Sequence, residues 1–340
     1  MSAGRAASLY VLERPGGLRI EVTPFGASWV SCQVPLADGT RRETLLGYAR
    51  LDEYLGGSAY FGATVGRYAN RIAGARYRHD GIEVTLAANQ WGNQLHGGPD
   101  GFDRRAWEVL HAGRRSLTLA LHSPDGDQGF PGAVDAQVSY VLDTDFSVRI
   151  DFTASVTRAT PLALTNHALF NLDARHTDCR AHRLRIAADR YVPVDAKLIP
   201  LGTLEPVAAD FDFRAAHPIA RDFLASAQQR LAGGYDHAWL LDPACRSGER
   251  PAAELESSDG RLQARLHTDQ PALQFYSGNV LDGVSRRGGG TYARHAGLAL
   301  EPGFPPDSPN HPEWTPWSDC FALPGVPWRA FLRWDFVSPA

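Results

Sequence analysis

Apolar residues alternate with polar or small residues along much of this chain, which is the pattern of half-buried β-strands. The alternation is clear at residues 117–121, 136–142 and 146–152, and it recurs at residues 18–22, 261–268 and 297–302. An Asp-Thr-Asp turn at residues 143–145 joins two of these runs, so residues 136–156 are predicted to form a β-hairpin. The pattern therefore predicts a fold made of many short strands.

Helical periodicity is sparse in the same sequence. Residues 49–55 are long enough for two helical turns, and residues 223–234 predict a short helix that ends at two glycines. The 33 glycines and 23 prolines supply the turns between strands. No repeat and no Pro/Ser-rich linker divides the chain, so we expect one domain spanning residues 1–340, with an all-β fold such as a β-sandwich and a few short helices.

One residue does not fit the apolar run LALTNHALFNLD at residues 162–173. In an extended conformation, His167 lies on the face opposite to a set of apolar side chains. That apolar face comprises Leu162, Leu164, Ala168, Phe170 and Leu172, together with Asn166. His167 is either a core histidine that has found a hydrogen-bond partner or a functional residue, and the local pattern leaves both interpretations open.

Charge and cysteine content narrow the classes of function. The chain has 34 basic and 38 acidic residues, a net charge of −4 and no basic stripe, so no nucleic-acid partner is expected. No apolar segment is long enough to span a membrane and the N-terminus has no secretory signal, so we expect no membrane partner and a cytoplasmic location. The cysteines are far apart and are expected to be reduced: Cys32, Cys179, Cys245 and Cys320.

Two stretches combine glycines with side chains that suit hydroxyl groups. GRYANRI at residues 66–72 places Arg67, Asn70 and Arg71 close together, and these donors and acceptors suit a rigid ligand with several hydroxyls. A solvated loop with a structural arginine would look the same. In NQLHGGPDGF at residues 93–102, two glycines follow His96 and would let a ligand approach the backbone, although a tight turn explains them equally well.

Two further stretches carry carboxylates. In GGYDHAW, Asp236 could accept two hydroxyl hydrogens or cap the next element, whereas His237 alternates with it and is expected to point elsewhere. Glu301 follows the apolar strand GLAL, where a charge is costly unless something uses it. The alternative is a strand-end carboxylate that turns to solvent or pairs with an arginine. The proline-rich loop after Glu301 is expected to be held by Asx-type turns.

Several other chemistries lack their motifs. The chain has no HExxH, EF-hand loop, GxxxxGK[ST] or GxSxG sequence, and its 12 histidines are dispersed without the spacing of metal ligands. The run RRGGGT at residues 286–291 is predicted to be a flexible loop. We therefore expect no catalytic metal.

Read in order, the conspicuous stretches resemble the aldose 1-epimerase (galactose mutarotase) family over most of the chain. The matching motifs are GRYANRI, NQLHGG with GFDRRAW, SPDGDQGFPG, TNHALFNL, DAKLIPLG with DFDFR, YDH, LQFYSGN and LEPGFPPDSPN. The resemblance implies a large antiparallel β-sandwich of the galactose mutarotase type, with a sugar cleft across one face. It also implies interconversion of the α and β anomers of a free aldose, such as galactose or glucose, without a cofactor.

The resemblance also assigns roles to individual residues. Glu301 matches the catalytic base of the family and His167 matches its catalytic acid. Arg71, His96 and Asp236 match substrate-binding positions, and Asn70 is a further candidate. The expected partner is a monosaccharide, and the chain is expected to be a monomer or a homodimer.

The sequence departs from the family pattern in two places. Gly303 replaces a common glutamine after the catalytic glutamate, and Ala168 with Leu169 replaces a serine and an aromatic residue after the histidine. These departures bear on substrate preference and affinity more than on the reaction.

Three other functions remain open at this stage. A non-catalytic sugar-binding module would keep the cleft but would not need both Glu301 and His167. A hexose-phosphate epimerase of the mutarotase type predicts several basic residues around a phosphate, for which Arg67 and Arg71 are the main candidates. A glycosidase would need a second carboxylate near Glu301, and Asp236 is the evident candidate.

Overall fold

Long antiparallel strands dominate the fold. The structure is a computed structural model that describes residues 8–315 and 317–339. The largest sheet has nine strands, in the order β10 (Glu108–Ala112), β11 (Ser116–Ser123), β12 (Val134–Thr144), β13 (Ser147–Val156), β27 (Trp328–Val337), β23 (Gln263–Thr268), β22 (Ala253–Glu256), β17 (Arg183–Ile186) and β20 (His217–Pro218). Every neighbouring pair in this order is antiparallel.

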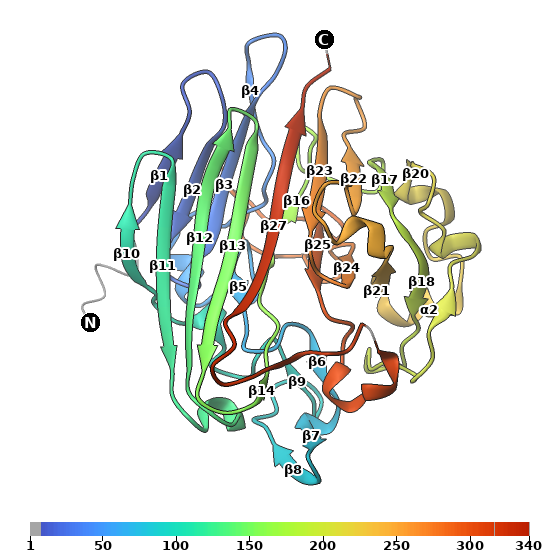
Figure 1. The fold of residues 1–340 in the computed structure, drawn as a ribbon. Coiled ribbons are helices and arrows are strands. Elements are labelled where there is room, and N and C mark those ends of the chain that lie inside the picture. Colours follow the sequence, from blue (N-terminus) through green and yellow to red (C-terminus); the bar gives the residue numbers. More distant parts are fainter. Residues whose placement is uncertain (1–7, 316, 340) are drawn as a thin grey trace.

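Two smaller sheets lie behind the nine-stranded sheet in Figure 1. One has six strands, in the order β16 (Leu169–Phe170), β25 (Leu298–Gly303), β24 (Ala272–Tyr276), β21 (Asp236–Leu241), β18 (Ala188–Val192) and β19 (Glu205–Pro206). The other has four strands, in the order β1 (Tyr10–Glu13), β2 (Arg19–Thr23), β3 (Ser28–Pro35) and β4 (Arg41–Glu43). The backbone of Leu45, just after β4, bridges to Phe170 in β16, so the two smaller sheets meet there.

Short paired strands and turns complete the fold. The pairs are β5 (Thr64–Val65) with β15 (Thr165–Asn166), β6 (Arg71–Ile72) with β9 (Gln94–Leu95), β7 (Arg76–His79) with β8 (Ile82–Thr85), and β14 (Thr160–Pro161) with β26 (Phe321–Ala322). Single 3₁₀ turns are η1 (Leu51–Leu55), η2 (Ala73–Ala75), η3 (Phe102–Arg104), η4 (Asp127–Gly129), η5 (Ala209–Phe211), η6 (Ile219–Asp222), η7 (Pro243–Cys245), η8 (Ser308–Asn310) and η9 (Pro312–Trp314).

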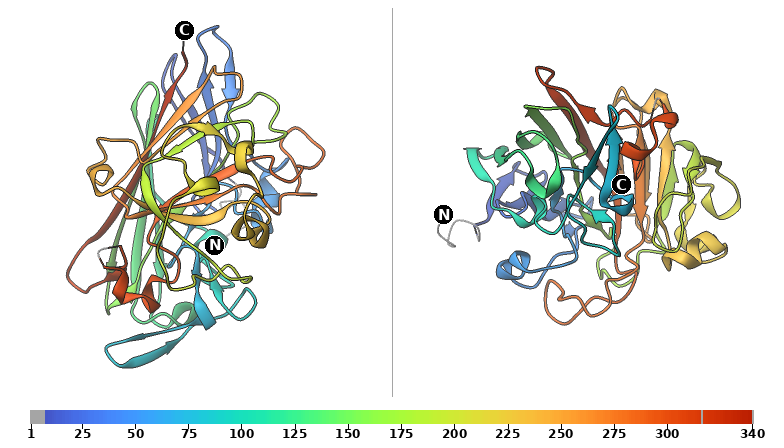
Figure 2. Two further views of the ribbon diagram at one scale, coloured as in Figure 1. Left: turned by 90° about the vertical axis from the view of Figure 1, so that its right-hand side faces the viewer. Right: turned by 90° about the horizontal axis from the view of Figure 1, so that it is seen from below.

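The main core lies between the nine-stranded sheet and the two smaller sheets (Figure 2). The Phe170 ring of β16 lies 4.3 Å from the Trp334 ring of β27 and 5.9 Å from the Trp29 ring of β3. Side chains from all three sheets therefore pack against one another, and this burial of apolar surface is the main force that holds the layers together.

The strands and helices predicted from the sequence are largely confirmed. The hairpin predicted at residues 136–156 is β12 and β13, whose buried and exposed positions alternate as the sequence does. The other alternating runs fall in β2, β11, β23 and β25. The helix predicted at 223–234 is shorter, α2 (Ala227–Ala232), with a Ser226 N-cap and the left-handed Gly233 at its end. Residues 49–55 form only the 3₁₀ turn η1.

Among residues 8–315 and 317–339, no helix is long and apolar enough to cross a membrane. The four cysteines are unpaired, as expected, and all four are buried. The expectation that there is no secretory signal rests partly on residues 1–7. These residues lie outside the part of the chain that the structure describes.

Candidate active site

The outer face of the six-stranded sheet carries three polar side chains on neighbouring strands. Asp236 begins β21, Gln274 lies in β24, and Glu301 lies in β25 directly opposite Gln274. Side chains alternate between the two faces of a strand, and the apolar neighbours Phe275 and Leu300 belong to the core on the inner face. Strand pairing thus brings together residues that are far apart in the sequence. Asp236 and Glu301, for example, are separated by 65 positions.

His167 reaches the same face from the segment between β15 and β16. Its backbone N–H donates to Ala63 O at 2.8 Å, and its carbonyl accepts from Gly62 N at 3.0 Å. The sequence pattern correctly separates His167 from the core, because the five apolar residues assigned to the other face all lie in the main core cluster. The run is not one continuous strand, however: β15 pairs with β5, whereas β16 pairs with β25.

Arg71 and His96 enter the site from the small pair of strands β6 and β9. Arg71 pairs with Leu95 in this ladder, which places His96 beside Asn70. The backbone of Asn70 donates to His96 Nδ1 at 3.1 Å, and the backbone of His96 donates to Asn70 O at 3.0 Å. Gly97 must be glycine in this turn, because its φ is +90° and an added Cβ would come within 1.9 Å of the Gly66 carbonyl oxygen.

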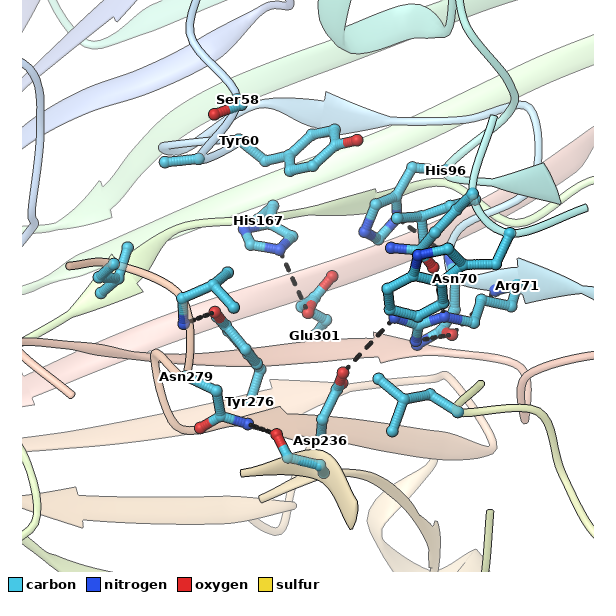
Figure 3. Close-up of a pocket in the computed structure, with 18 of the residues that line it drawn as sticks. Ser58, Tyr60, Asn70, Arg71, His96, His167, Asp236, Tyr276, Asn279 and Glu301 are labelled. Carbon is cyan, nitrogen blue, oxygen red and sulfur yellow. Dashed lines mark hydrogen bonds and ion pairs between the residues drawn. The ribbon is translucent and has the colours of Figure 1, made fainter. Parts of the chain in front are cut away.

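These side chains converge on one cavity of about 410 Å³ (Figure 3). The residues expected from the sequence that line it are Asn70, Arg71, His96, His167, Asp236 and Glu301. All six predicted site residues are thus brought together.

The buried pair at the centre of the cavity is His167 and Glu301. His167 Nε2 lies 3.7 Å from Glu301 Oε1, and each residue is only 6% exposed. Burial, together with Asp236 nearby, raises the pKa of the Glu301 carboxyl to about 8, although Arg71 opposes this shift. Burial lowers the pKa of the His167 imidazole to about 4. The two shifts together favour one exchangeable proton on the pair at neutral pH, on Glu301 rather than on His167.

His96 is a hydrogen-bond donor toward the cavity. Its Nδ1 accepts the Asn70 N–H, so in the neutral ring the proton must be on Nε2. Burial, with further contributions from His167 and Arg71, lowers the pKa of His96 well below its usual value. A neutral imidazole with a fixed Nε2–H suits a sugar oxygen.

The same tautomer argues against a metal at this site. Ligand atoms of His96, His167 and Glu301 all lie within 4.8 Å of one another, and two histidines with one carboxylate are a common metal-binding set. A metal would need the lone pair of His96 Nε2, but that nitrogen carries the proton while Nδ1 is occupied by the Asn70 N–H. The donor set thus fits an acid–base site better than a metal centre.

A polar network fixes the other end of the cavity. Arg71 Nε donates to Gln90 Oε1 at 2.8 Å, and Arg71 Nη2 lies 3.6 Å from Asp236 Oδ2. Gln274 Nε2 donates to the other carboxylate oxygen of Asp236 at 2.6 Å. Of the two roles considered for Asp236, this arrangement favours ligand contact over capping. Arg71 and Asp236 present a donor and an acceptor side by side.

Two tyrosines that the sequence did not single out border His167. The Tyr60 ring lies 4.8 Å from the His96 ring and 5.4 Å from the His167 ring, and Tyr276 lies 6.3 Å from His167 (Figure 3). Tyr276 and Gln274 fall within the motif LQFYSGN, where the alternation with Phe275 was an available signal. Tyr60 lies in a turn with φ +53°, and no periodicity indicates its direction.

Three other predictions about motif residues now have an outcome. His237 is fully buried on the core side of β21, as expected from its alternation with Asp236. Asp307 holds the proline-rich loop by accepting from Ala73 N, in a distant segment, and from the side-chain Nδ2 of Asn310, so the expected Asx-type turn is wrong for this residue. The prediction that Arg67 recognises hydroxyl groups is wrong, because this residue does not line the cavity. Arg67 is a structural arginine, but it is buried and does not lie in a solvated loop.

Arg67 ties its own segment to both ends of the loop between β11 and β12. It donates to Ser123 Oγ and to the carbonyl oxygens of Ser123, Pro124, Pro131 and Gly132. A lysine in its place would leave several of these buried acceptors without a donor, because the planar fork is lost.

We expect Arg67→Lys to lower the free energy of unfolding by about 2–4 kcal/mol, since each buried acceptor left unpaired costs about 1–3 kcal/mol. Chemical denaturation of this variant and of Arg78→Lys, whose arginine is exposed in β7, measures the difference. Wild-type stability in Arg67→Lys combined with a loss of sugar turnover would contradict the structural role.

Comparisons with known proteins agree with this architecture. The sequence model of the aldose 1-epimerase family matches residues 8–333. The chain is 47% identical over 336 residues to the aldose 1-epimerase of Escherichia coli K12, covering 98% of this chain and 96% of that protein. It is 37% identical to galactose mutarotase of Rattus norvegicus, covering 93% and 90% of the two chains.

Solved structures give the same result at the level of the fold. An aldose epimerase homologue from C. elegans superimposes with a TM-score of 0.90 at 27% identity, covering 98% of this chain and 99% of that one. Galactose 1-epimerase from Lactobacillus acidophilus superimposes with a TM-score of 0.83 at 27% identity, covering 97% and 94%. The predicted mutarotase-type sandwich is confirmed, and the chain belongs to the aldose 1-epimerase family.

Proposed function

We propose that this chain interconverts the α and β anomers of a free aldose, with Glu301 as the base and His167 as the acid. The observation that carries the proposal is the buried His167–Glu301 pair, 3.7 Å apart, in a cavity lined by hydroxyl-binding groups. Membership of the aldose 1-epimerase family supports it.

Anomer exchange needs one proton to leave the C1 hydroxyl and one to reach the ring oxygen. Glu301 takes the C1 hydroxyl proton while His167 gives a proton to the ring oxygen, and the C1–O5 bond breaks to give the open aldehyde. The C1–C2 bond rotates, and the ring oxygen then attacks the other face of the carbonyl while His167 takes its proton back from O5 and Glu301 gives its proton to the C1 oxygen. Groups that act in this way contribute about 10²- to 10⁴-fold each.

Burial suits this cycle because the pair holds one proton throughout. Ring opening leaves the proton on Glu301 and a neutral His167, which is the form that burial favours. The form ready to react is the tautomer with an ionised Glu301 and a protonated His167. Arg71 lowers the pKa of Glu301 and so lowers the cost of that ionised form.

The other predicted residues hold the sugar in this proposal. His96 donates from Nε2, Arg71 donates to hydroxyl oxygens, and Asp236 accepts hydroxyl hydrogens. Asn70 lines the cavity, and its backbone N–H fixes the ring of His96. Holding the sugar in one orientation converts binding into rate acceleration.

The alternative functions are less compatible with the site. A hexose phosphate would need several cations, but Arg71 is the only arginine or lysine among the described residues that line the cavity. A glycosidase would use Asp236 as its second carboxylate, but Gln274 donates to Asp236 and Arg71 Nη2 lies 3.6 Å from it, contacts that orient this carboxylate as an acceptor of hydroxyl hydrogens. A binding module would not need a buried acid–base pair.

Three further proposals concern the domain organisation of the chain, its location and oligomeric state, and its partners. We propose that residues 1–340 form a single domain, which is supported by a main core cluster that includes both Leu12 and Phe336. We also propose a cytoplasmic monomer or homodimer, on the sequence-based arguments given above, with a monosaccharide as the partner and no nucleic acid.

Anomer exchange can be measured at equilibrium by two-dimensional NMR exchange between the α and β anomeric protons of galactose and of glucose. The enzyme should add exchange cross-peaks that buffer alone does not give. Binding of these sugars without added exchange, for every aldose tried, would favour the sugar-binding module instead.

The pH dependence of kcat/KM follows from the two shifted pKa values. The singly protonated pair predominates between about pH 4 and about pH 8. We expect kcat/KM to be flat across that range, to fall below about 4 as the pair gains a second proton, and to fall above about 8 as it loses the first. Initial rates corrected for the buffer reaction test this. A midpoint near pH 6.5, the ordinary pKa of histidine, would contradict the buried pair.

A further inference from the structure

The loop that follows Glu301 is fastened to the strand that carries Arg71. Asp307 lies six residues after Glu301, and its backbone N–H donates to Arg71 O at 2.8 Å. Its carboxylate oxygen Oδ1 accepts from Ala73 N at 2.9 Å. Asp307 therefore holds the backbone on both sides of Ile72, as a residue of a neighbouring strand would.

These two bonds occupy the edge of β6 that has no strand beside it. In the described part of the chain, β6 pairs with β9 and with no other strand. The carbonyl of Asn70 faces β9, since it accepts from His96 N at 3.0 Å, and successive residues of a strand alternate in direction. The backbone groups of Arg71 and Ala73 therefore point to the opposite edge, where Asp307 bonds to both.

The connection between Glu301 and Asp307 is stiff. Three of the five intervening residues are prolines, which have a fixed φ. The carbonyl oxygen of Pro305 accepts from Ser308 Oγ at 2.7 Å and from Tyr68 OH at 3.1 Å. The loop therefore fixes the distance between the catalytic strand β25 and the residue that bonds to β6.

Asp307 occupies its place at an energetic cost. It is 2% exposed and has a φ of +61°, and both a buried carboxylate and a positive φ are unfavourable. His311 Nε2 lies 3.5 Å from Asp307 Oδ2, and His311 Nδ1 lies 2.8 Å from Glu313 Oε1. Burial lowers the pKa of His311, but hydrogen bonds with Asp307 and Glu313 raise it above its usual value overall. The imidazolium offsets part of the cost of burying the carboxylate.

We propose that Asp307 is a positioning residue for the reaction, which holds Arg71 at a fixed distance from Glu301. The inference rests on the proposed function, in which Arg71 contacts the sugar and Glu301 takes the C1 hydroxyl proton. Burial and Asp236 raise the pKa of Glu301, whereas Arg71 lowers it, so the position of Arg71 also affects how readily the base ionises. Asp307 itself does not line the cavity and acts through Arg71.

Three variants of this loop test the proposal. Asp307→Gly tolerates the positive φ but removes the acceptor of Ala73 N. Asp307→Asn keeps an oxygen for Ala73 N and also tolerates this φ. Ser308→Ala is the matched control, because it removes a buried side-chain hydrogen bond within the same loop, to Pro305 O, and Ser308 does not line the cavity.

We expect Asp307→Gly to lower kcat/KM for galactose about 10- to 100-fold, as expected when a group that holds the substrate is displaced by about 1 Å. Asp307→Asn should restore most of this loss, and Ser308→Ala should stay close to wild type. The fall in kcat/KM above about pH 8 should move to higher pH in Asp307→Gly, because a displaced Arg71 no longer lowers the pKa of Glu301. Loss of the negative charge of Asp307 alone would move it to lower pH.

A double-variant cycle separates positioning from folding. Arg71→Met removes the guanidinium that Asp307 is proposed to position. In that background, Asp307→Gly should lower kcat/KM by less than about twofold further, because its effect passes through the missing group. Hydrogen exchange of the Ala73 amide should be faster in Asp307→Gly than in Ser308→Ala, which measures the lost hydrogen bond independently of turnover.

The outcomes that contradict the proposal are distinct from a failure of the proposed function. Equal losses in Asp307→Gly and Ser308→Ala, or losses that multiply fully with Arg71→Met, would mean that the loop serves folding alone and would overturn the positioning role. Wild-type kcat/KM in Asp307→Gly would overturn it as well. If the wild type accelerated anomer exchange for no aldose, the proposed function itself would fail, whatever the exchange rate at Ala73.

Discussion

Glu301→Gln is expected to lower kcat for anomer exchange by about 10³-fold while leaving KM within a few-fold of wild type. Glutamine has nearly the same shape and can still form hydrogen bonds with a sugar hydroxyl, but its amide cannot take the C1 hydroxyl proton. An interaction that acts only in the transition state should appear in kcat and not in KM. Initial rates over a range of galactose concentrations separate the two constants.

The same variant carries an internal check on folding. The pKa of Glu301 is about 8 in the folded state against its ordinary value of 4.5, so the folded protein binds the Glu301 proton more tightly than the unfolded chain does. The stability that this proton provides is present below about pH 4.5 and is lost as the pH rises to about 8. Wild type should therefore lose stability relative to Glu301→Gln over that window.

A matched control is Glu254→Gln, which changes a glutamate in β22 of the nine-stranded sheet. It should keep wild-type kcat, because Glu254 does not line the cavity. If Glu301→Gln kept more than about a tenth of wild-type kcat, the assignment of Glu301 as the base would be wrong.

His167→Gln is the second large effect that we expect, a loss of about 10²- to 10³-fold in kcat. The glutamine amide can donate a hydrogen bond to the ring oxygen but cannot transfer a proton to it. The variant should also lose the flat range between about pH 4 and about pH 8, because Glu301 alone must be ionised to act as the base and its rate should rise with pH toward about 8. This change in the pH profile would not follow from a loss of packing alone.

The control for His167 is His267→Gln, which removes a similarly buried imidazole from β23. His267 is 5% exposed and bonds to Gly248 O, far from the residues that line the cavity. We expect its kcat per folded molecule to match wild type. Equal losses in the two variants would indicate that any buried histidine is needed for the fold, and would remove the case for His167 as the acid.

Much of this architecture could be predicted from the sequence because strands have a period of two. The alternation located the β12–β13 hairpin and separated His167 from the five apolar residues of its own segment. The same rule places Asp236 and His237 on opposite faces of β21. Local pattern was informative wherever the backbone was extended and one face was buried.

The roles within GRYANRI could not be predicted in this way. Arg67 and Arg71 are four residues apart, yet Arg67 binds loop carbonyls inside the structure and Arg71 enters the cavity. The segment between them is irregular, and Asn70 has φ +67°, so no period predicts side-chain direction. Tyr60 was missed for the same reason, since it lies in a turn with positive φ.

The pairing of His167 with Glu301 is a tertiary contact across 134 residues, the difference between their positions. Family resemblance suggested that the two residues act together, but neither their distance nor their burial was available from the sequence. Burial also determines where the proton resides. The roles of base and acid need an ionised Glu301 and a protonated His167 at the start of ring opening, whereas the pKa shifts favour the neutral tautomer of the same pair.

The most direct test is polarimetry of freshly dissolved α-D-galactose with wild type, Glu301→Gln, His167→Gln and the double variant. If the two residues share one proton and work as a unit, wild type should speed the change in rotation strongly. Each single variant should lose nearly all of that acceleration, and the double variant should be little worse than either single one. A wild-type rate equal to that of buffer, or single losses that multiply in the double variant, would contradict the account.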